Sequence, residues 1–187
     1  MKFRHWGLAA GLLAASLGSG VAQADPAGRV AVYIAPQYYD HEVKLWHFYY
    51  SYWVNQGQAL EQPALEAFKP AFAETDLCHA RGTADVVVEL KPHLFYNPHM
   101  TTYFADVKAT VFSGSGKPLG IYKGEAQTLG FLDVVPAAKV HQVYRQAMND
   151  LVKHIQADAT VMSLAQKGLP ESETKMPCEM ASVLPTK

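Results

Sequence analysis

The hydrophobic positions of this chain change their period along the sequence, from the alternation of strands to the wider spacing of helices. An apolar, β-branched run from Arg29 to Ala35 predicts a first strand that ends at Pro36. A second strand is predicted from Leu45 to Val54, where aromatic side chains fall alternately on two faces. Between Gly57 and Ala73 the spacing of leucine and phenylalanine favours a helix, with Pro63 in its first turns.

Three further strands are predicted in the second half of the chain. Residues Ala84 to Leu90 form an apolar run typical of a buried strand, and residues Pro92 to His99 are predicted to form a loop. The alternation from Thr101 to Phe112 predicts a long strand with one buried face. A Gly-Ser turn at residues 113–116 then leads into a partner strand from Leu119 to Gln127.

A second helix is predicted to begin at Pro136. Its apolar stripe is formed by Val140, Val143, Tyr144, Ala147, Leu151 and Ile155. The predicted order is therefore ββαβββα. Because hairpin strands predominate, we expect an α+β fold, a two-layer sandwich whose mostly antiparallel or mixed sheet of about 4–5 strands carries both helices on one face.

This succession of segments resembles a group of small bacterial envelope proteins. The segments that carry the likeness are Val30-Ala31-Val32-Tyr33-Ile34, Gly57-Gln58-Ala59-Leu60, Ala84-Asp85-Val86-Val87-Val88-Glu89, the hairpin turn at residues 114–117 and the closing amphipathic helix. The chain is most similar to the auxiliary lipoprotein component of ABC-type transport systems, over residues 29–161 and in element order. The resemblance implies a binding or accessory role without catalytic residues. It does not carry over the lipid anchor, since the lipidated Cys is missing.

The first 24 residues have the pattern of a secretory signal peptide. Lys2 and Arg4 precede a short apolar stretch, and Ala22-Gln23-Ala24 forms a small-x-small cleavage site before Asp25. Residues 1–24 are therefore predicted to be removed, and we expect a periplasmic protein released without a transmembrane anchor, with secretion from the cell as the alternative.

Export changes the interpretation of the two cysteines. In an oxidising compartment Cys78 and Cys178 are predicted to form a disulfide, since a redox-active pair would favour a C-x-x-C motif that is missing here. The bridge would close a loop of about 100 residues, which the chain-entropy model values at about 4–5 kcal/mol. It would tether an irregular tail, residues 166–187, to a single domain at residues 25–165.

Length and charge narrow the possible partners. The chain has 187 residues, with 16 Lys+Arg against 17 Asp+Glu and a formal net charge of −1. Such a length suits one domain that folds without a metal or cofactor, and the nearly balanced charge argues against nucleic acid as a partner. We expect an envelope protein or a small apolar ligand instead. The sequence leaves the oligomeric state open.

Few residues carry recognisable chemistry. His93 and His99 share the predicted loop and are the best metal candidates, but no third ligand stands at a suitable spacing, so we interpret this segment as a polar loop without a cofactor. Ser115 lies in a turn between two strands, whereas a nucleophile elbow joins a strand to a helix. The sequence therefore predicts a protein that is not an enzyme.

Aromatic residues are concentrated in one segment. Eight of the 16 residues from Tyr38 to Trp53 are aromatic. We expect one face of the predicted strand to line the core with Trp46, Phe48, Tyr50 and Tyr52. The open face would then present a partner or ligand surface made of Tyr33, Tyr38, Tyr39, Tyr49 and Trp53. The alternative is an aromatic strand buried on both sides or covered by the C-terminal tail.

Three functions follow as hypotheses. The first is a soluble periplasmic binding or accessory protein of the envelope, which acts by protein or ligand binding without catalysis. The second is a carrier that holds a lipid or other small apolar ligand between helices and sheet. The third is a metal-binding protein that uses the loop from His93 to His99.

Overall fold

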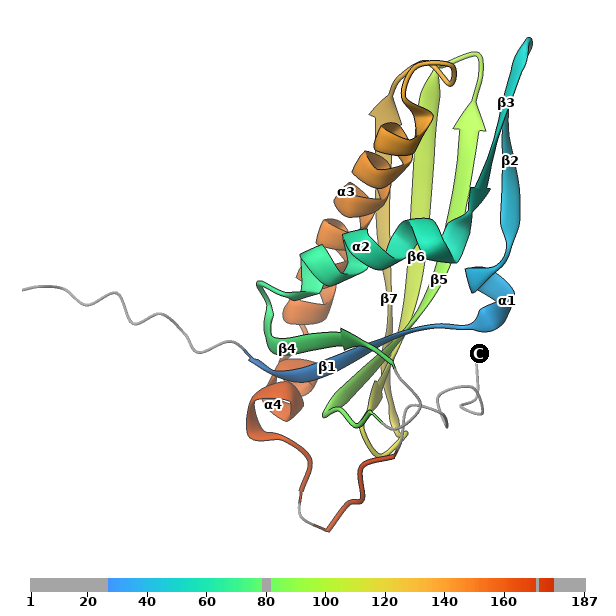
Figure 1. The fold of residues 1–187 in the computed structure, drawn as a ribbon. Helices are drawn as coiled ribbons and strands as arrows, with labels where there is room; N and C mark the ends of the chain where they lie inside the picture. The colour runs from blue at the N-terminus through green and yellow to red at the C-terminus, as the bar shows by residue number, and fades with distance from the viewer. Residues whose placement is uncertain (1–26, 79–81, 171, 177–187) are drawn as a thin grey trace, which may run out of the picture.

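The computed structural model describes residues 27–78, 82–170 and 172–176 (Figure 1). Its strands are β1 (Ala27–Ile34), β2 (Glu42–His47), β3 (Tyr50–Asn55), β4 (Phe72–Leu77), β5 (Val86–Asn97), β6 (Thr102–Ser113) and β7 (Pro118–Leu129). Its helices are α1 (Pro36–Tyr39), α2 (Gln56–Phe68), α3 (Pro136–Gln156) and α4 (Ala159–Lys167).

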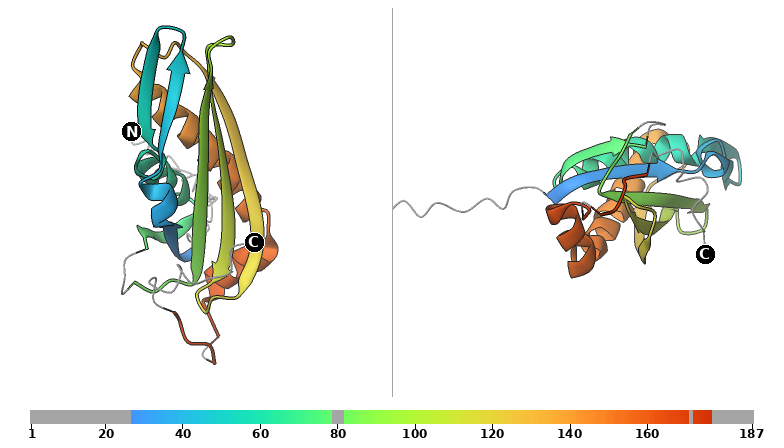
Figure 2. Two further views of the ribbon diagram at one scale, coloured as in Figure 1. Left: turned by 90° about the vertical axis from the view of Figure 1, so that its right-hand side faces the viewer. Right: turned by 90° about the horizontal axis from the view of Figure 1, so that it is seen from below.

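The strands form one mixed sheet and one separate hairpin. The five-stranded sheet has the order β4-β1-β5-β6-β7, and β2 pairs with β3 alone. Strand β1 runs parallel to both of its neighbours, whereas β5, β6 and β7 form an antiparallel meander. Figure 2 shows the long meander strands side by side, with the hairpin beside their upper part. The predicted α+β class is confirmed, and α2, α3 and α4 pack against the sheet.

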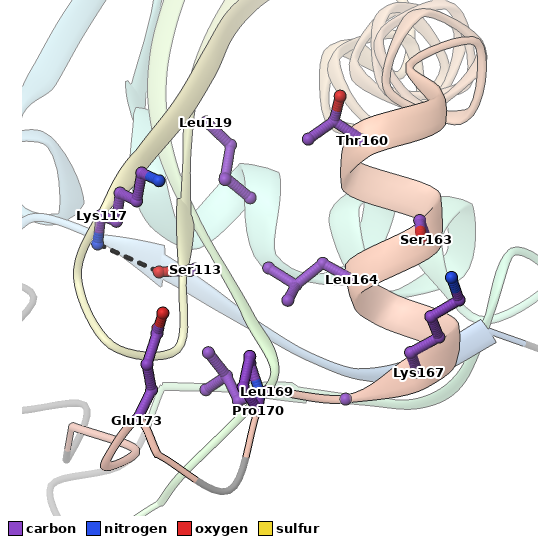
Figure 3. A pocket seen from close by; sticks show the side chains of 11 residues that line it. Ser113, Lys117, Leu119, Thr160, Ser163, Leu164, Lys167, Leu169, Pro170 and Glu173 are labelled. Carbon is purple, nitrogen blue, oxygen red and sulfur yellow. Dashed lines mark hydrogen bonds between the residues drawn. The ribbon is translucent and has the colours of Figure 1, made fainter.

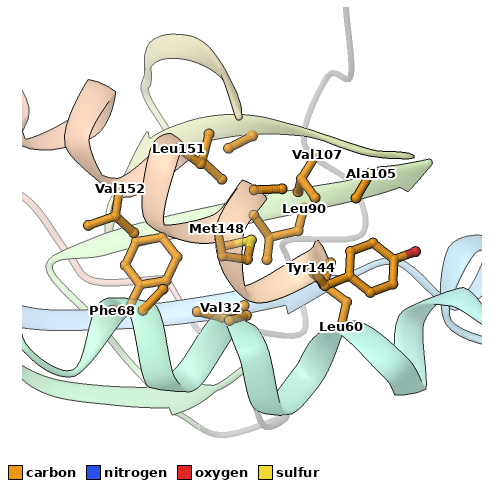
Figure 4. Close-up of a cluster of buried hydrophobic side chains, with 14 of the residues drawn as sticks. Val32, Leu60, Phe68, Leu90, Ala105, Val107, Tyr144, Met148, Leu151 and Val152 are labelled. Atoms are coloured by element: carbon orange, nitrogen blue, oxygen red, sulfur yellow. The ribbon is translucent and has the colours of Figure 1, made fainter. Parts of the chain in front are cut away.

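The core lies between the helices and one face of the sheet (Figure 4). The predicted alternation of β6 is confirmed, because Tyr103, Val107 and Val111 are fully buried on its helix-facing side. The predicted stripe of α3 is also confirmed, since every one of its residues is buried. Helix and sheet approach closely at Gly124 of β7, which has no Cβ to separate its backbone from α3.

The predicted single strand from Leu45 to Val54 is wrong, because the chain reverses at Phe48 and Tyr49 to form the β2–β3 hairpin. In the observed register Leu45 is opposite Tyr52, so an odd-numbered and an even-numbered residue share one face. Alternation therefore does not continue across the turn. The turn escaped prediction because its two residues are aromatic, whereas tight turns usually contain Gly, Asn, Asp or Pro.

The predicted loop from Pro92 to His99 is also wrong over most of its length, because β5 continues to Asn97. A proline inside a sheet lacks the N–H that its neighbour strand would need. Here the loss is harmless, because β1 pairs with β5 only as far as Leu90. Leu94 follows Pro92 by two residues, so its backbone N–H is on the same edge of β5 as the position of Pro92. This N–H donates to the side-chain oxygen of Gln56 at 2.8 Å, in place of a bond to β1.

Some predictions fall outside the described residues. The signal peptide of residues 1–24 and Cys178 both do, so the cleavage site and the bridge from Cys78, which directly follows β4, stay predictions. Strand β4 and the short helices α1 and α4 were not predicted. Among the described helices, none is long and apolar enough to cross a membrane.

Candidate interaction surface

The β2–β3 hairpin is held to the body of the protein by its inner face. Leu45 and Val54 are buried in the main core, and Tyr52 packs against it. At the base of the hairpin, the backbone N–H of Gln56 donates to the carbonyl oxygen of His41 at 3.0 Å, while its side chain accepts the β5 bond described above. The hairpin therefore projects from the sheet in a fixed direction (Figure 1).

The outer face and the tip of the hairpin are open to solvent. Trp46 and Trp53 lie on the outer face and are about half exposed, and the Lys44 ammonium stands 5.7 Å from the centre of the Trp53 ring. At the tip, Phe48 is 55% exposed and Tyr49 is 96% exposed. Aromatic rings displayed in this way are usual anchors of binding surfaces.

The turn between β5 and β6 lies next to the hairpin tip. The side chain of Asn97 shapes this turn by accepting hydrogen bonds from the backbone N–H groups of His99 at 3.0 Å and Met100 at 3.2 Å. The His99 ring meets the Phe48 ring edge to face, with 5.3 Å between centroids. The two tips are therefore at one level, and Met100 adds an exposed apolar side chain there.

The linker between β7 and α3 completes this end of the molecule. The N–H of Gly130 donates to the Thr101 carbonyl at 2.8 Å, which ties the linker to the β5–β6 turn. Two tyrosine hydroxyls bind the linker backbone: Tyr96 donates to the Gly130 carbonyl at 3.2 Å, and Tyr103 donates to the Phe131 carbonyl at 3.3 Å. Burial raises the pKa of both phenols, so both remain protonated donors at neutral pH.

These three loops together present what we call the apolar end. Its exposed large side chains are Trp46, Phe48, Tyr49, Tyr50, Met100, Leu129, Phe131, Val134 and Val135. Residues 45–55, 92–105 and 126–132 contain no Asp, Glu, Lys or Arg, and Asp133 is the first charged residue of the linker. Asp133, exposed between Phe131 and Val134, is the one charged residue within the three connecting segments. Exposed apolar side chains gathered with so few charged neighbours mark an interaction site more often than an ordinary protein surface.

Backbone strain is found at the same end. Thr101 has φ = 47° and Val135 has φ = 43°, and they are the non-glycine residues with positive φ in the described part of the chain. A β-branched residue in this conformation costs on the order of 1–3 kcal/mol. Strain of this kind tends to cluster at functional sites, which adds an independent reason to place the site here.

The structure divides the predicted partner residues into two groups. Tyr49 and Trp53 lie on the hairpin, as expected for a partner surface, but Tyr33, Tyr38 and Tyr39 lie on β1 and α1, away from its tip. Tyr33 packs against a small second core, and together with Tyr39 it lines a cavity of about 200 Å³.

The prediction that Trp46, Phe48 and Tyr50 line the core is wrong, since all three are exposed. Tyr52 alone of that set packs on the core.

The histidine candidates do not converge on a metal site. His93 is exposed on β5, with its ring 5.8 Å from that of Phe95, whereas His99 is in the turn against Phe48. In the described ranges, no three His, Cys, Asp or Glu side chains gather closely enough to hold a metal ion.

A cavity of about 500 Å³ lies at the opposite end of the molecule, between α4, the β6–β7 turn and the following segment (Figure 3). Its hydroxyl groups are used structurally, since Ser113 and Ser115 are 2.9 Å apart and Ser115 donates to Glu173 at 2.5 Å. The Ser113 hydroxyl also accepts the Lys117 N–H at 3.1 Å. The hydrogen bonds of these two serines within the described residues involve no histidine.

Sequence reasoning missed the contributions of the β5–β6 turn and the β7–α3 linker. Met100, Leu129 and Phe131 lie in segments with little periodicity, where an isolated apolar residue predicts neither burial nor a binding role. The signal that could have found them is the shared lack of charged residues in three segments far apart in sequence. Only the fold brings these segments together.

Comparison with known proteins gives a likeness of fold. No protein-family model and no curated protein matches the chain. Among solved structures, protein XCC0632 from Xanthomonas campestris, of family DUF330, is similar with a TM-score of 0.51 and 12% identity, over 78% of this chain and 91% of that one. The PelC dodecamer from Paraburkholderia phytofirmans gives a TM-score of 0.42 and 11% identity, over 67% and 89%. At these identities the likeness concerns the fold alone, and membership of the auxiliary lipoprotein family stays a prediction.

Proposed function

We propose that this protein is a non-catalytic accessory protein of the bacterial envelope, which acts by binding a partner through its apolar end. The observation that carries the proposal is the gathering of nine exposed large apolar side chains on the β2–β3 hairpin, the β5–β6 turn and the end of β7 with its linker. A monomer in water would gain nothing from this arrangement, whereas a partner that covers these side chains would remove them from water. The predicted signal peptide supports the location in the envelope.

The absence of catalysis is part of the same proposal. Ser113 and Ser115 lie within hydrogen-bond distance of each other, and Ser115 donates to Glu173. No three His, Cys, Asp or Glu side chains of the described residues gather at one place. The buried carboxylate of Glu89 lies on the sheet face away from the helices, opposite Thr110, and its nearest cation is Lys91 at 3.7 Å. None of these groups forms the nucleophile, base and orienting residue that acyl transfer needs.

The carrier hypothesis is less well supported. A ligand between helices and sheet would need space that Phe68, Tyr144 and Met148 fill in the core (Figure 4). The metal hypothesis has no ligand set among the described residues. Binding at the apolar end is therefore the function that the geometry favours.

The proposal is tested by photo-crosslinking in living cells. A photoreactive amino acid replaces Tyr49 at the hairpin tip, and a control carries it at Lys153, which is exposed on α3. We expect an adduct from position 49 alone, and we expect Phe131→Asp, on a different loop, to abolish it. No adduct from position 49, or equal adducts from both positions, contradicts the proposal.

A further inference from the structure

We infer that the partner of the apolar end is the surface of a lipid bilayer, into which the three loops insert their exposed side chains. This inference rests on the proposed function, because it names the partner of the same site. The loops form the protruding end of an elongated molecule, as Figure 1 shows, so they can meet a flat surface together. Their mutual contacts, from Phe48 to His99 and from Gly130 to Thr101, keep them at one level.

The distribution of charge matches the layers of a bilayer. Counted from the tip of the hairpin, the first cation on β2 is Lys44, four residues before Phe48. At the usual rise of a strand, Lys44 is therefore about 13 Å from Phe48. On β6 the first charged residue is Asp106, four residues after Thr102 and so also about 13 Å from the strand's end. On the hairpin and at the β5–β6 turn, an uncharged tip is thus followed by charged groups at a similar distance, as lipid tails are followed by polar headgroups. The exposed Asp133 of the linker takes its place at the level of the headgroups.

The residue types at the border of the cap suit this position. Trp and Tyr concentrate at membrane interfaces, where their rings meet the apolar layer and their polar atoms stay hydrated. Trp53 lies at the border, and the ammonium of Lys44 stands 5.7 Å from the centre of its ring, where it can meet the headgroups. A surface that binds another protein usually has a rim of charged and hydrogen-bonding side chains around its apolar centre. We would expect such side chains within these loops if the partner were a protein.

The backbone limits how deeply the hairpin can enter. Strands β2 and β3 pair only with each other, so each has one edge with unpaired N–H and C=O groups. Such groups are not tolerated in hydrocarbon, where no water can satisfy them. The contact is therefore shallow, at the level of headgroups and upper acyl carbons, and it holds the protein at the membrane without crossing it.

Intrinsic fluorescence provides a direct test. Trp46 and Trp53 are the only tryptophans of residues 25–187, and both lie on the hairpin, so emission reports this site alone. The mature chain is mixed with vesicles of phosphatidylcholine or of phosphatidylethanolamine with phosphatidylglycerol, and binding is measured by flotation. We expect binding to both compositions within about twofold of each other, because the hairpin tip and the β5–β6 turn carry no charge. Emission should shift to the blue and be quenched by lipids brominated near the headgroup.

Variants connect the binding to the apolar end. Tyr49→Asp and Phe131→Asp should each lower the vesicle partition coefficient about tenfold, because each places a carboxylate in the inserted layer. Thr174→Asp makes the same change of charge at an exposed position near the opposite end and should leave binding unchanged. Because Tyr49 and Phe131 are both exposed, their melting temperatures should match that of the unaltered protein.

Failure of this inference can be told apart from failure of the proposed function. No vesicle binding, binding to anionic vesicles alone, or binding that survives both substitutions together overturns the bilayer as partner. If position 49 then still crosslinks to a protein in cells, the proposed function stands with a protein partner. If neither vesicles nor crosslinks are found, both are wrong.

Discussion

The close approach of β7 and α3 can be tested by adding one methyl group at Gly124. A Cβ built there would lie 2.6 Å from the backbone N of Leu151 and 2.7 Å from its Cβ, and it would also strike the carbonyl oxygen of Ala147. These are atoms of the helix backbone or close to it, so α3 itself must shift. Overpacking of this kind costs about 3 kcal/mol, of which about 0.5–1 kcal/mol is returned because alanine is stiffer than glycine when unfolded.

Gly124→Ala should therefore lower the free energy of unfolding by about 2 kcal/mol, or the melting temperature by about 4–8 °C for a domain of this size. The measurement is thermal and urea unfolding of the mature chain, followed by circular dichroism. Gly130→Ala is the matched control, because its Cβ would meet only the flexible side chain of Lys139 at 2.8–3.2 Å. Equal melting temperatures for the two variants would show that helix and sheet are not packed as described.

Three further substitutions test single features. Tyr144→Phe removes a buried hydroxyl that has no hydrogen-bond partner among the described residues. It should raise the free energy of unfolding by about 1 kcal/mol, measured by urea unfolding, and a loss of stability would reveal a hidden partner. Burial raises the pKa of Glu89. The contribution of its protonated side chain to stability is therefore complete below the ordinary pKa of the group and is lost as pH rises. Glu89→Gln should flatten the dependence of the unfolding free energy on pH above about pH 4, and an unchanged dependence refutes this. Val135→Gly should relieve backbone strain and stabilise by about 1 kcal/mol in thermal unfolding, whereas lower stability contradicts the strain.

The elements that sequence predicted well are those in which pattern and environment agree. Strand β7 and helix α3 each have one face toward the core and one toward water, so the spacing of their apolar residues reports their structure directly. The hairpin violates this relation, because Trp46 and Trp53 are as apolar as a core strand and yet half exposed. Under the proposed function this hydrophobicity serves partner binding, whereas a pattern of apolar residues by itself predicts burial in the core.

The remaining differences depend on tertiary contacts. Pro92 can stay in β5 because β1 ends its pairing at Leu90, which no local pattern indicates. The aromatic concentration was a correct pointer to Tyr49 and Trp53 as exposed residues. It could not find Met100 or Phe131, because the apolar end exists only where three loops meet.

The position of β1 affects how the chain can be made and moved. This first strand lies between β4 and β5, and the last helix, α4, packs on it where Gly28 approaches Ala165. A chain that lacks β4, β5 or α4 cannot make all the contacts that bury β1, so an incomplete chain cannot complete this fold. Completion of the fold therefore requires both the first strand and the last helix of the described chain. For the export that the predicted signal peptide of residues 1–24 would direct, such a topology would keep the incomplete chain from folding before it is translocated.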